Sequence, residues 1–282
     1  YTLRHNHGID QDLTLLSIAA WFPELRDSER WLRLAVTRLR TQIDAVVSPR
    51  GVTLEHSAAY HYHMLTSRLQ RLHELFAANP QWPYRLDLES LLAAMAEFLA
   101  WNLTPDNHLP PIGDTNPHPR LTLGSTLRPV AQRSALLRYA LTEGREGSPG
   151  GRFMLYRDEG YAFFRDTWTP DGGYGAAFHA VFTAAAHAGL GHKQWDDLSF
   201  VLYAFGAPLL VDAGAYSYDA ADPARRYVVS AKAHNTVIVD DVGFEGWTAR
   251  IEAGVDGEGF AAVRGSHAND PGWRHRRTLV HL

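Results

Sequence analysis

The stretch GREGSPGG at residues 144–151 separates two parts of this sequence that differ in their hydrophobic periodicity. Glycine and proline at this density interrupt both helices and strands. Upstream, apolar residues recur three and four positions apart, whereas downstream they form short runs in which apolar and polar residues alternate. We therefore predict two domains, a helical one over residues 1–147 and a β-rich one over residues 148–282.

The helical spacing falls in several regions separated by segments that contain proline or glycine. These regions are residues 13–20, 31–46, 60–76, 88–99 and 129–141. Short connections predict antiparallel helix pairs. A long proline-rich segment at residues 104–119 interrupts them, and such loops are uncommon unless they are functional or disordered. It contains PIGDT at residues 111–115, where Asp114 has the simpler interpretation of holding a turn.

Downstream of residue 148, glycine and proline turns separate short alternating runs, which predicts an antiparallel sheet system arranged as a sandwich. The predicted strands are RFMLYRD, YAFFRD, AAFHAVFTAAA, LSFVLYAF, APLLVDA, NTVIVDD, GFAAVRGS and WRHRRTLVHL.

The composition is that of a folded protein, with 45% hydrophobic and 21% charged residues. A formal net charge of -4 argues against a general nucleic-acid binder. Cysteine is absent, which excludes disulfides, thiolate catalysis and cysteine-ligated zinc. No apolar run is long enough to span a bilayer, and the first residues lack the pattern of a signal peptide. Because the sequence begins at Tyr1 without methionine and ends within a strand pattern, we expect a fragment of a longer protein.

Two polar clusters in the helical part are candidate site residues. RHNHG at residues 4–8 precedes a helix that Asp10 is placed to cap. EHSAAYHYH at residues 55–63 joins a loop to the start of a helix, on which Tyr60 and His63 share a face. A solvated helix entry and a tyrosine that anchors the core are the structural alternatives.

In the β-rich part, histidines and carboxylates stand near the ends of predicted strands within residues 191–239. His192 and Gln194 alternate on one face of an extended segment. Asp212 ends the apolar run of one predicted strand, and His234 precedes the next. Metal ligands drawn from different strands and hydrogen-bonded structural side chains both fit this placement.

Three ordered motifs in this part resemble the heparinase II/III-like family of polysaccharide lyases. They are HKQWDDLSF at residues 192–200, LVDAG at 210–214 followed by Tyr216 and Tyr218, and AHNTV at 233–237. In the helical part, NHG at residues 6–8 and EHSAAYH at residues 55–61 are similar to motifs of the same family. The resemblance implies an incomplete α/α toroid followed by an antiparallel β-sandwich, with a substrate cleft between them. It also implies that the chain lacks the first toroid helices and the end of the sandwich.

The resemblance further implies a reaction, the cleavage of an acidic polysaccharide by β-elimination at a uronic acid. Asn6 would hydrogen-bond the uronate carboxylate, with His7 assisting. Tyr60 would donate its phenolic proton to the leaving oxygen, and His192 would take the C5 proton. In relatives that act on the opposite C5 configuration, the same tyrosine serves as both base and acid.

The family's other site residues fall into two groups. The candidate substrate-binding residues are Glu55, His61, Tyr216, Tyr218 and Arg226, with Arg225 as an alternative to Arg226. Asp212 and His234 match the family's structural metal ligands, but Gln194 stands where the usual third ligand is a histidine. Since an amide oxygen is a poorer zinc ligand than imidazole, we leave open a structural zinc, a different or weaker ion, and a trio held by hydrogen bonds alone.

Two other functions remain open from the sequence. A glycoside hydrolase on a similar toroid needs two carboxylates across the bond, and Glu55, Asp114 and Asp197 are available. A non-catalytic carbohydrate-binding protein of polysaccharide assembly also suits the fold. The expected partner is an acidic polysaccharide such as a glycosaminoglycan, alginate or a bacterial exopolysaccharide, with no nucleic acid and no membrane span. The resemblance implies a periplasmic or secreted bacterial protein.

Overall fold

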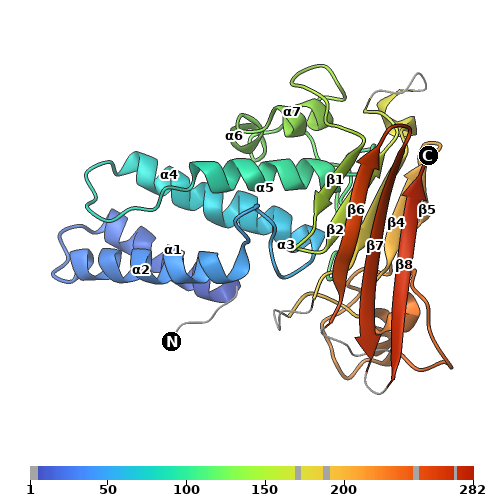
Figure 1. Ribbon diagram of the computed structural model, residues 1–282. Coiled ribbons are helices and arrows are strands. Elements are labelled where there is room, and N and C mark those ends of the chain that lie inside the picture. Colours follow the sequence, from blue (N-terminus) through green and yellow to red (C-terminus); the bar gives the residue numbers. More distant parts are fainter. Residues whose placement is uncertain (1–5, 169–172, 187–190, 244–247, 270–271) are drawn as a thin grey trace.

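The fold is taken from a computed structural model that describes all residues except 1–5, 169–172, 187–190, 244–247 and 270–271. Helices fill the first part of the chain, and antiparallel strands with the short helix α8 (Pro223–Val229) among their loops make up the second, as Figure 1 shows. Arg4 and His5 of the predicted polar cluster lie outside the described residues.

The helices match the predicted regions. They are α1 (Asn6–Trp21), α2 (Ser28–Val46), α3 (Ala58–His63), α4 (Gln70–Ala78), α5 (Glu89–Asn102), α6 (Arg128–Ala131) and α7 (Ala135–Leu141). The first two form an antiparallel pair. Because α1 begins at Asn6, Asp10 lies inside the helix and does not cap it, contrary to our prediction.

A π-helical segment, η1 (Met64–Leu69), joins α3 to α4 in one continuous helical run. The sequence periodicity predicts this run as a plain α-helix. The π segment is not visible in that periodicity, because it adds about one residue per turn without breaking the apolar face. Met64, Leu65 and Leu69 all remain buried. Wide turns of this kind are frequent at functional sites.

The strands form two sheets that pack face to face. A five-stranded sheet contains β1 (Phe153–Tyr156), β2 (Tyr161–Arg165), β3 (His179–Thr183), β4 (Phe200–Ala204) and β5 (Ala207–Leu210), in that order. A three-stranded sheet contains β6 (Arg250–Gly257), β7 (Phe260–Asn269) and β8 (Trp273–His281). Phe182 and Val263 share the apolar cluster between them. A Cβ on Gly265 would lie 2.9 Å from the Phe182 ring, so a glycine is needed for this close approach.

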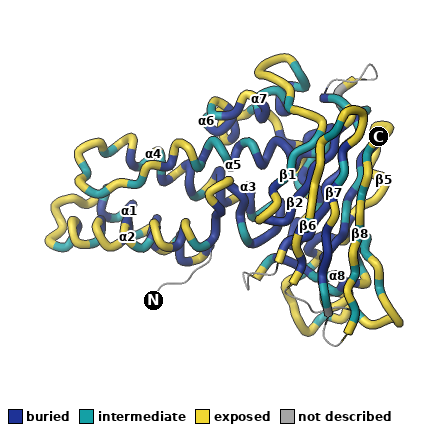
Figure 2. The backbone as a smooth tube through the Cα atoms, viewed as in Figure 1, coloured by how far each residue is buried: buried dark blue, intermediate teal, exposed yellow. Residues whose placement is uncertain are grey.

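The helices and the first sheet share one hydrophobic core, which holds the two parts in a fixed relation (Figure 2). Phe98 of α5 makes edge contacts with Tyr156, Tyr161 and Phe163, at ring centroid distances of 5.1 to 5.6 Å. The fully buried Arg165 donates to the carbonyl of Leu103 at the end of α5. Side chains on either side of this junction can therefore build a single site.

One strand prediction was wrong, and one strand was not predicted. The run NTVIVDD forms no strand but a loop closed by a bridge between Val239 and Val242. Its first residue, Asn235, donates from its amide to the carbonyls of Phe200 and Val211, so it joins two other segments instead. Strand β6 has no counterpart in our prediction, because RIEAGVDG carries two glycines and two acidic residues and lacks a clear apolar alternation.

Candidate active site

A cleft of about 590 Å³ lies between the helical part and the loops of the β-rich part. Its lining residues come from α1, from the run of α3, η1 and α4, from the proline-rich loop and from the segment after β5. They are Asn6, His7, Asp10, Ala59, Tyr60, His63, Ser67, Arg68, Arg71, Asp114, Asn116, Pro117, His118 and Tyr218. Predicted catalytic residues Asn6, His7 and Tyr60 are among them.

Tyr60 and His192 meet at this cleft from opposite parts of the chain. Their rings stack with centroids 3.4 Å apart and planes inclined by 18°. Ser57 caps α3 and accepts from the Tyr60 backbone N–H, which places Tyr60 in the first turn of the helix. The hydroxyl of Tyr218 lies 3.1 Å from that of Tyr60. The structure thus brings together the predicted proton donor and the predicted base.

Asn6 stands at the start of α1 on the helical side of the cleft. Its backbone N–H donates to Glu55 Oε1 over 3.4 Å, and Glu55 is 1% exposed. Although Asn6 itself is 5% exposed, it lines the cleft. His7 follows on the exposed side of the same helix start. Glu55 therefore holds the Asn6 backbone from the buried side of the helix start. It is not placed to contact a substrate, contrary to our prediction.

His61 is also a support rather than a substrate contact. Its Nδ1 lies 3.1 Å from Thr53 Oγ1, and its Nε2 lies 3.0 Å from the Met95 carbonyl. Burial lowers the pKa of His61 to about 4, so the ring is neutral at ordinary pH. The ring fixes α3 against α5 and has no access to the cleft.

Of the predicted substrate contacts in the β-rich part, only Tyr218 lines the cleft. Tyr216 is 61% exposed outside it. Arg226 lies in α8 and donates to the carbonyls of Ala220 and Ala221 just before that helix. It does not line the cleft, so the assignment of Arg226 is not supported. The neighbouring Arg225, which the sequence offered as the alternative, pairs with Asp114 of the proline-rich loop at 2.8 Å.

The sequence interpretation missed a cationic arm of the cleft, which we define as His63, Arg68, Arg71 and His118. Arg68 pairs with Asp10 at 2.8 Å. Burial, with the charges of Arg68 and His118, lowers the pKa of His63. The sequence could have indicated His63 and Arg71, because residues 60, 63, 67 and 71 follow helical spacing and so continue the face of the helix that carries Tyr60.

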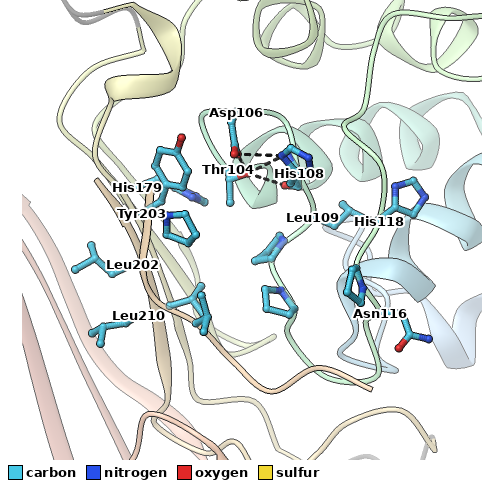
Figure 3. Close-up of a pocket in the computed structure, with 16 residues that line it drawn as sticks. Thr104, Asp106, His108, Leu109, Asn116, His118, His179, Leu202, Tyr203 and Leu210 are labelled. Atoms are coloured by element: carbon cyan, nitrogen blue, oxygen red, sulfur yellow. Dashed lines mark hydrogen bonds and ion pairs between the residues drawn. The ribbon is translucent and has the colours of Figure 1, made fainter. Parts of the chain in front are cut away.

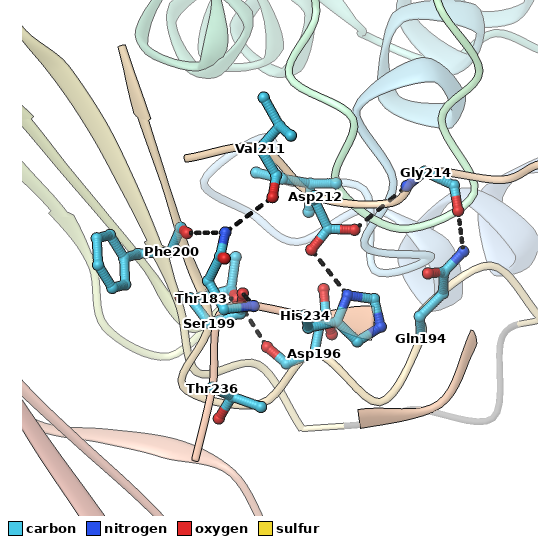
Figure 4. Close-up of polar contacts among 12 residues, drawn as sticks. Thr183, Gln194, Asp196, Ser199, Phe200, Val211, Asp212, Gly214, His234 and Thr236 are labelled. Atoms are coloured by element: carbon cyan, nitrogen blue, oxygen red, sulfur yellow. Dashed lines mark hydrogen bonds and ion pairs between the residues drawn. The ribbon is translucent and has the colours of Figure 1, made fainter. Parts of the chain in front are cut away.

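The predicted metal trio forms a hydrogen-bonded group (Figure 4). Asp212 Oδ2 lies 2.8 Å from His234 Nδ1, and Asp212 Oδ1 accepts from the Gly214 N–H at 3.3 Å. Gln194 donates to the carbonyl of Gly214 at 2.9 Å and to Asp114 at 2.7 Å. Two buried atoms of ligand type, Gln194 Oε1 and His234 Nε2, have no hydrogen-bond partner among the residues that the structure describes.

These residues supply fewer donors than structural zinc usually takes. Asp212, His234 and Gln194 offer one carboxylate, one imidazole nitrogen and one amide oxygen, whereas structural zinc takes four ligands. Within the part of the chain that the structure describes, no group of three or more His, Asp and Glu side chains is placed to hold a metal. The zinc stays a prediction, to be tested by measuring the metal content of the purified protein.

A second, mostly apolar cavity of about 460 Å³ lies between the proline-rich loop and strands β3 to β5 (Figure 3). Its polar groups include the pair Asp106 and His108, 3.2 Å apart. Residues 116–118 line both this cavity and the cleft. The loop therefore separates the two spaces.

The loop that carries His192 is anchored by the next residue. Lys193 is buried, and its Nζ lies 2.5 Å from Asp196 Oδ1 and 2.8 Å from Asp197 Oδ1. Burial alone lowers the pKa of Lys193, but the two carboxylates outweigh it and the net shift is upward. The three charges hold the segment between His192 and β4.

We expect Lys193→Met to destabilise the fold strongly, because it leaves two carboxylates buried without their cation. Breaking such a buried pair costs about 3 to 5 kcal/mol, which corresponds to a fall of roughly 10 °C in the unfolding midpoint. Lys232→Met is the matched control, since Lys232 pairs with Asp241, whose side chain is 88% exposed. Thermal unfolding of both variants measures the difference, and equal midpoints would contradict the anchoring role.

Comparison with known proteins agrees with this architecture. A family model described as Heparinase II/III N-terminus matches residues 1–133, and one described as Heparinase II/III-like, C-terminal matches residues 148–282. The heparin-sulfate lyase of Pedobacter heparinus is 22% identical over 289 residues, covering 100% of this chain and 43% of the relative. The heparin-sulfate lyase of Bacteroides stercoris is 24% identical over 224 residues, covering 77% of this chain and 32% of the relative.

Solved structures show the same fold. The crystal structure of heparinase III superposes with a TM-score of 0.85 at 19% identity, covering 98% of this chain and 45% of that one. The crystal structure of a heparan sulfate lyase from Pedobacter heparinus gives a TM-score of 0.81 at 22% identity, with coverages of 98% and 43%. The chain thus spans less than half the length of these relatives. With both domain models matched in order and the fold shared throughout, the chain belongs to the heparinase II/III-like family.

Proposed function

We propose that this chain carries the catalytic cleft of a polysaccharide lyase that cleaves a uronic-acid-containing polymer by β-elimination. The observation that carries the proposal is the stacking of His192 on Tyr60, which lines the cleft together with Asn6. A hydroxyl and an imidazole in contact supply the acid and the base that an elimination needs.

The chemistry follows from the weak acidity of the C5 proton beside a carboxylate that is already charged. The Asn6 amide neutralises that carboxylate by hydrogen bonding as negative charge develops, and one such donor is worth about 3 kcal/mol. His192 takes the C5 proton. The C4–O bond then breaks, and the Tyr60 phenol protonates the leaving oxygen. For the opposite C5 configuration, Tyr60 both removes and returns the proton.

The cationic arm supports an acidic substrate. Arg68 is balanced by Asp10, whereas Arg71 is exposed and, among the described residues, makes only a 3.5 Å contact to Ser17 Oγ. Its guanidinium is therefore available to a carboxylate or a sulfate ester. Heparan sulfate, the substrate named for the relatives, carries both groups, and we propose a glycosaminoglycan of this type as the first substrate to test.

The wider setting of the site rests on the family likeness. We propose that helices α1 to α7 are a section of an incomplete α/α toroid, that the two sheets belong to a β-sandwich, and that the domain boundary falls at residues 147–148. A periplasmic or secreted location suits an enzyme for extracellular polymers. Among the described residues, no helix has the length and apolarity needed to span a membrane.

The test incubates the complete protein with heparan sulfate, unsulfated heparosan, alginate and hyaluronan and follows the ultraviolet absorbance of an unsaturated uronate. We expect that absorbance to rise with at least one polymer. New reducing ends without it would refute elimination and favour hydrolysis. Binding without cleavage would favour a carbohydrate-binding protein.

The geometry does not favour a hydrolase. That mechanism needs two carboxyl groups across the bond. Glu55 is buried behind Asn6, and Asp197 is buried against Lys193. Asp114 lines the cleft, but it is paired with Arg225.

A further inference from the structure

Asp114 is a buried carboxylate at the centre of the site, and both of its oxygens accept hydrogen bonds. Oδ2 lies 3.2 Å from His192 Nδ1 and 3.0 Å from an Arg225 Nη2 atom. Oδ1 accepts from Gln194 Nε2 at 2.7 Å and lies 2.8 Å from the same Arg225 nitrogen. Three side chains of the β-rich part thus converge on one carboxylate of the proline-rich loop.

The backbone of Asp114 connects the two walls of the cleft. Its N–H donates to the His192 carbonyl at 3.0 Å, and its own carbonyl accepts from Ser57 Oγ at 3.0 Å. Ser57 is the N-cap of the helix that carries Tyr60. Residue 114 therefore touches both the cap of the Tyr60 helix and the loop of His192.

The turn before Asp114 is tight enough to require glycine. Gly113 has a φ of +59°, and a Cβ there would lie 2.4 Å from the His56 carbonyl oxygen and 2.9 Å from that of His192. Any side chain would force the loop away from one wall. The sequence PIGDT, whose Asp114 had the simple interpretation of a turn residue, thus places a carboxylate against a histidine.

The contact with Asp114 fixes the state of the His192 ring. A carboxylate flanked by Arg225 accepts only, so the ring nitrogen that faces it, Nδ1, must carry a proton. The lone pair of the neutral ring then resides on Nε2, which is the arrangement in which a histidine accepts a proton from a substrate.

Arg225 holds the carboxylate in place. Its side chain is 12% exposed, and its guanidinium also donates to the Ala215 carbonyl at 2.6 Å and lies 5.5 Å from the centre of the Tyr218 ring. It therefore orients Asp114 and the Tyr218 segment together.

We propose that Asp114 is a positioning residue that holds His192 with its proton on Nδ1 and sets its distance from Tyr60, with Arg225 fixing the carboxylate. The inference rests on the proposed function in assigning His192 as the base. The contacts that carry it are independent of that function.

The test is Asp114→Asn, which keeps the shape and removes one acceptor. The new amide N–H₂ takes the place of one of the two carboxylate oxygens. It therefore faces Arg225 together with either His192 or Gln194, and all three side chains donate to the carboxylate in the present arrangement. When it faces His192, Nδ1 becomes the acceptor and Nε2 carries the proton. The equivalent change in a Ser-His-Asp triad lowers kcat by about 10⁴-fold, and we expect a fall of at least about 10²-fold here with KM nearly unchanged.

Asp106→Asn is the matched control, because Asp106 pairs with His108 in the same loop and does not line the cleft. The second readout is the ¹⁵N NMR signature of the His192 ring, assigned by its loss in His192→Gln. We expect the Nδ1–H tautomer in the wild-type protein and a loss of that tautomer in Asp114→Asn.

Two results would overturn the proposal. One is an Nε2–H ring in the wild-type protein. The other is an Asp114→Asn variant that retains its kcat. A variant whose kcat falls only when KM rises and the unfolding midpoint falls as well would also overturn it, because a purely structural residue behaves in that way. If the wild-type protein cleaves no polymer, the proposed function fails, and the NMR readout alone still decides the role of Asp114.

Discussion

Tyr60→Phe is expected to abolish measurable turnover while substrate affinity is retained. The phenylalanine ring keeps the stacking on His192 but has no hydroxyl to protonate the leaving oxygen. Loss of a general acid costs about 10²- to 10⁴-fold in kcat. Initial rates on the best polymer of the panel, with binding of the same polymer measured separately, separate kcat from affinity.

Tyr84→Phe serves as the control for that measurement, since Tyr84 is a half-buried residue of the helical part that does not line the cleft. Full activity in Tyr60→Phe would refute the assigned role. Tyr218 would then be the next candidate, because its hydroxyl lies 3.1 Å from that of Tyr60. Burial and the Tyr60 hydroxyl raise the pKa of Tyr218, which suits a proton donor better than a base.

His192→Gln is expected to lower kcat by about 10²-fold or more on polymers whose C5 configuration requires a separate base. Glutamine still offers hydrogen-bonding groups but cannot take a proton. On polymers of the opposite C5 configuration, where Tyr60 acts as both base and acid, we expect a smaller loss. Rates on uronate polymers of each defined configuration give this ratio directly.

His73→Gln controls for the change of side chain, since His73 is a surface residue on α4 that pairs with Glu89 at 3.7 Å. A His192→Gln variant that loses activity equally on both configurations would contradict a base role and indicate that the ring only supports Tyr60. An unchanged unfolding midpoint must accompany either result, because His192 also bonds to Asp114.

Much of the fold was predictable from local pattern. The helical regions and most strands follow from spacing alone, because burying one face of a helix or a strand imposes a period on its residues. The π segment and the break between α6 and α7 were not predictable, since neither changes which residues are apolar. Strand β6 was missed because it has glycines where side chains would clash with their neighbours, so its sequence lacks the apolar alternation of a strand.

The residue types of the site were predictable, but their roles were sorted only by burial. Asn6, Tyr60 and His192 belong to motifs that the sequence displays, and the structure brings all three to one cleft or its edge. Glu55 and His61 belong to the same motifs and are buried supports. Sequence distance gives no information on which side of a helix start faces a cavity formed by a distant loop.

By itself, the sequence determined the division at residues 144–151, the helical and β-rich character of each part, and the family motifs. All of these depend on interactions between residues close in the chain, or on residue identity alone. Only the tertiary structure decided that Asp114 bonds to His192, 78 positions away, and that Arg225 rather than Arg226 reaches the cleft loop. A hydrogen bond depends on the meeting of two walls to within about 3 Å, and the shared core of α5 and β2 sets that distance.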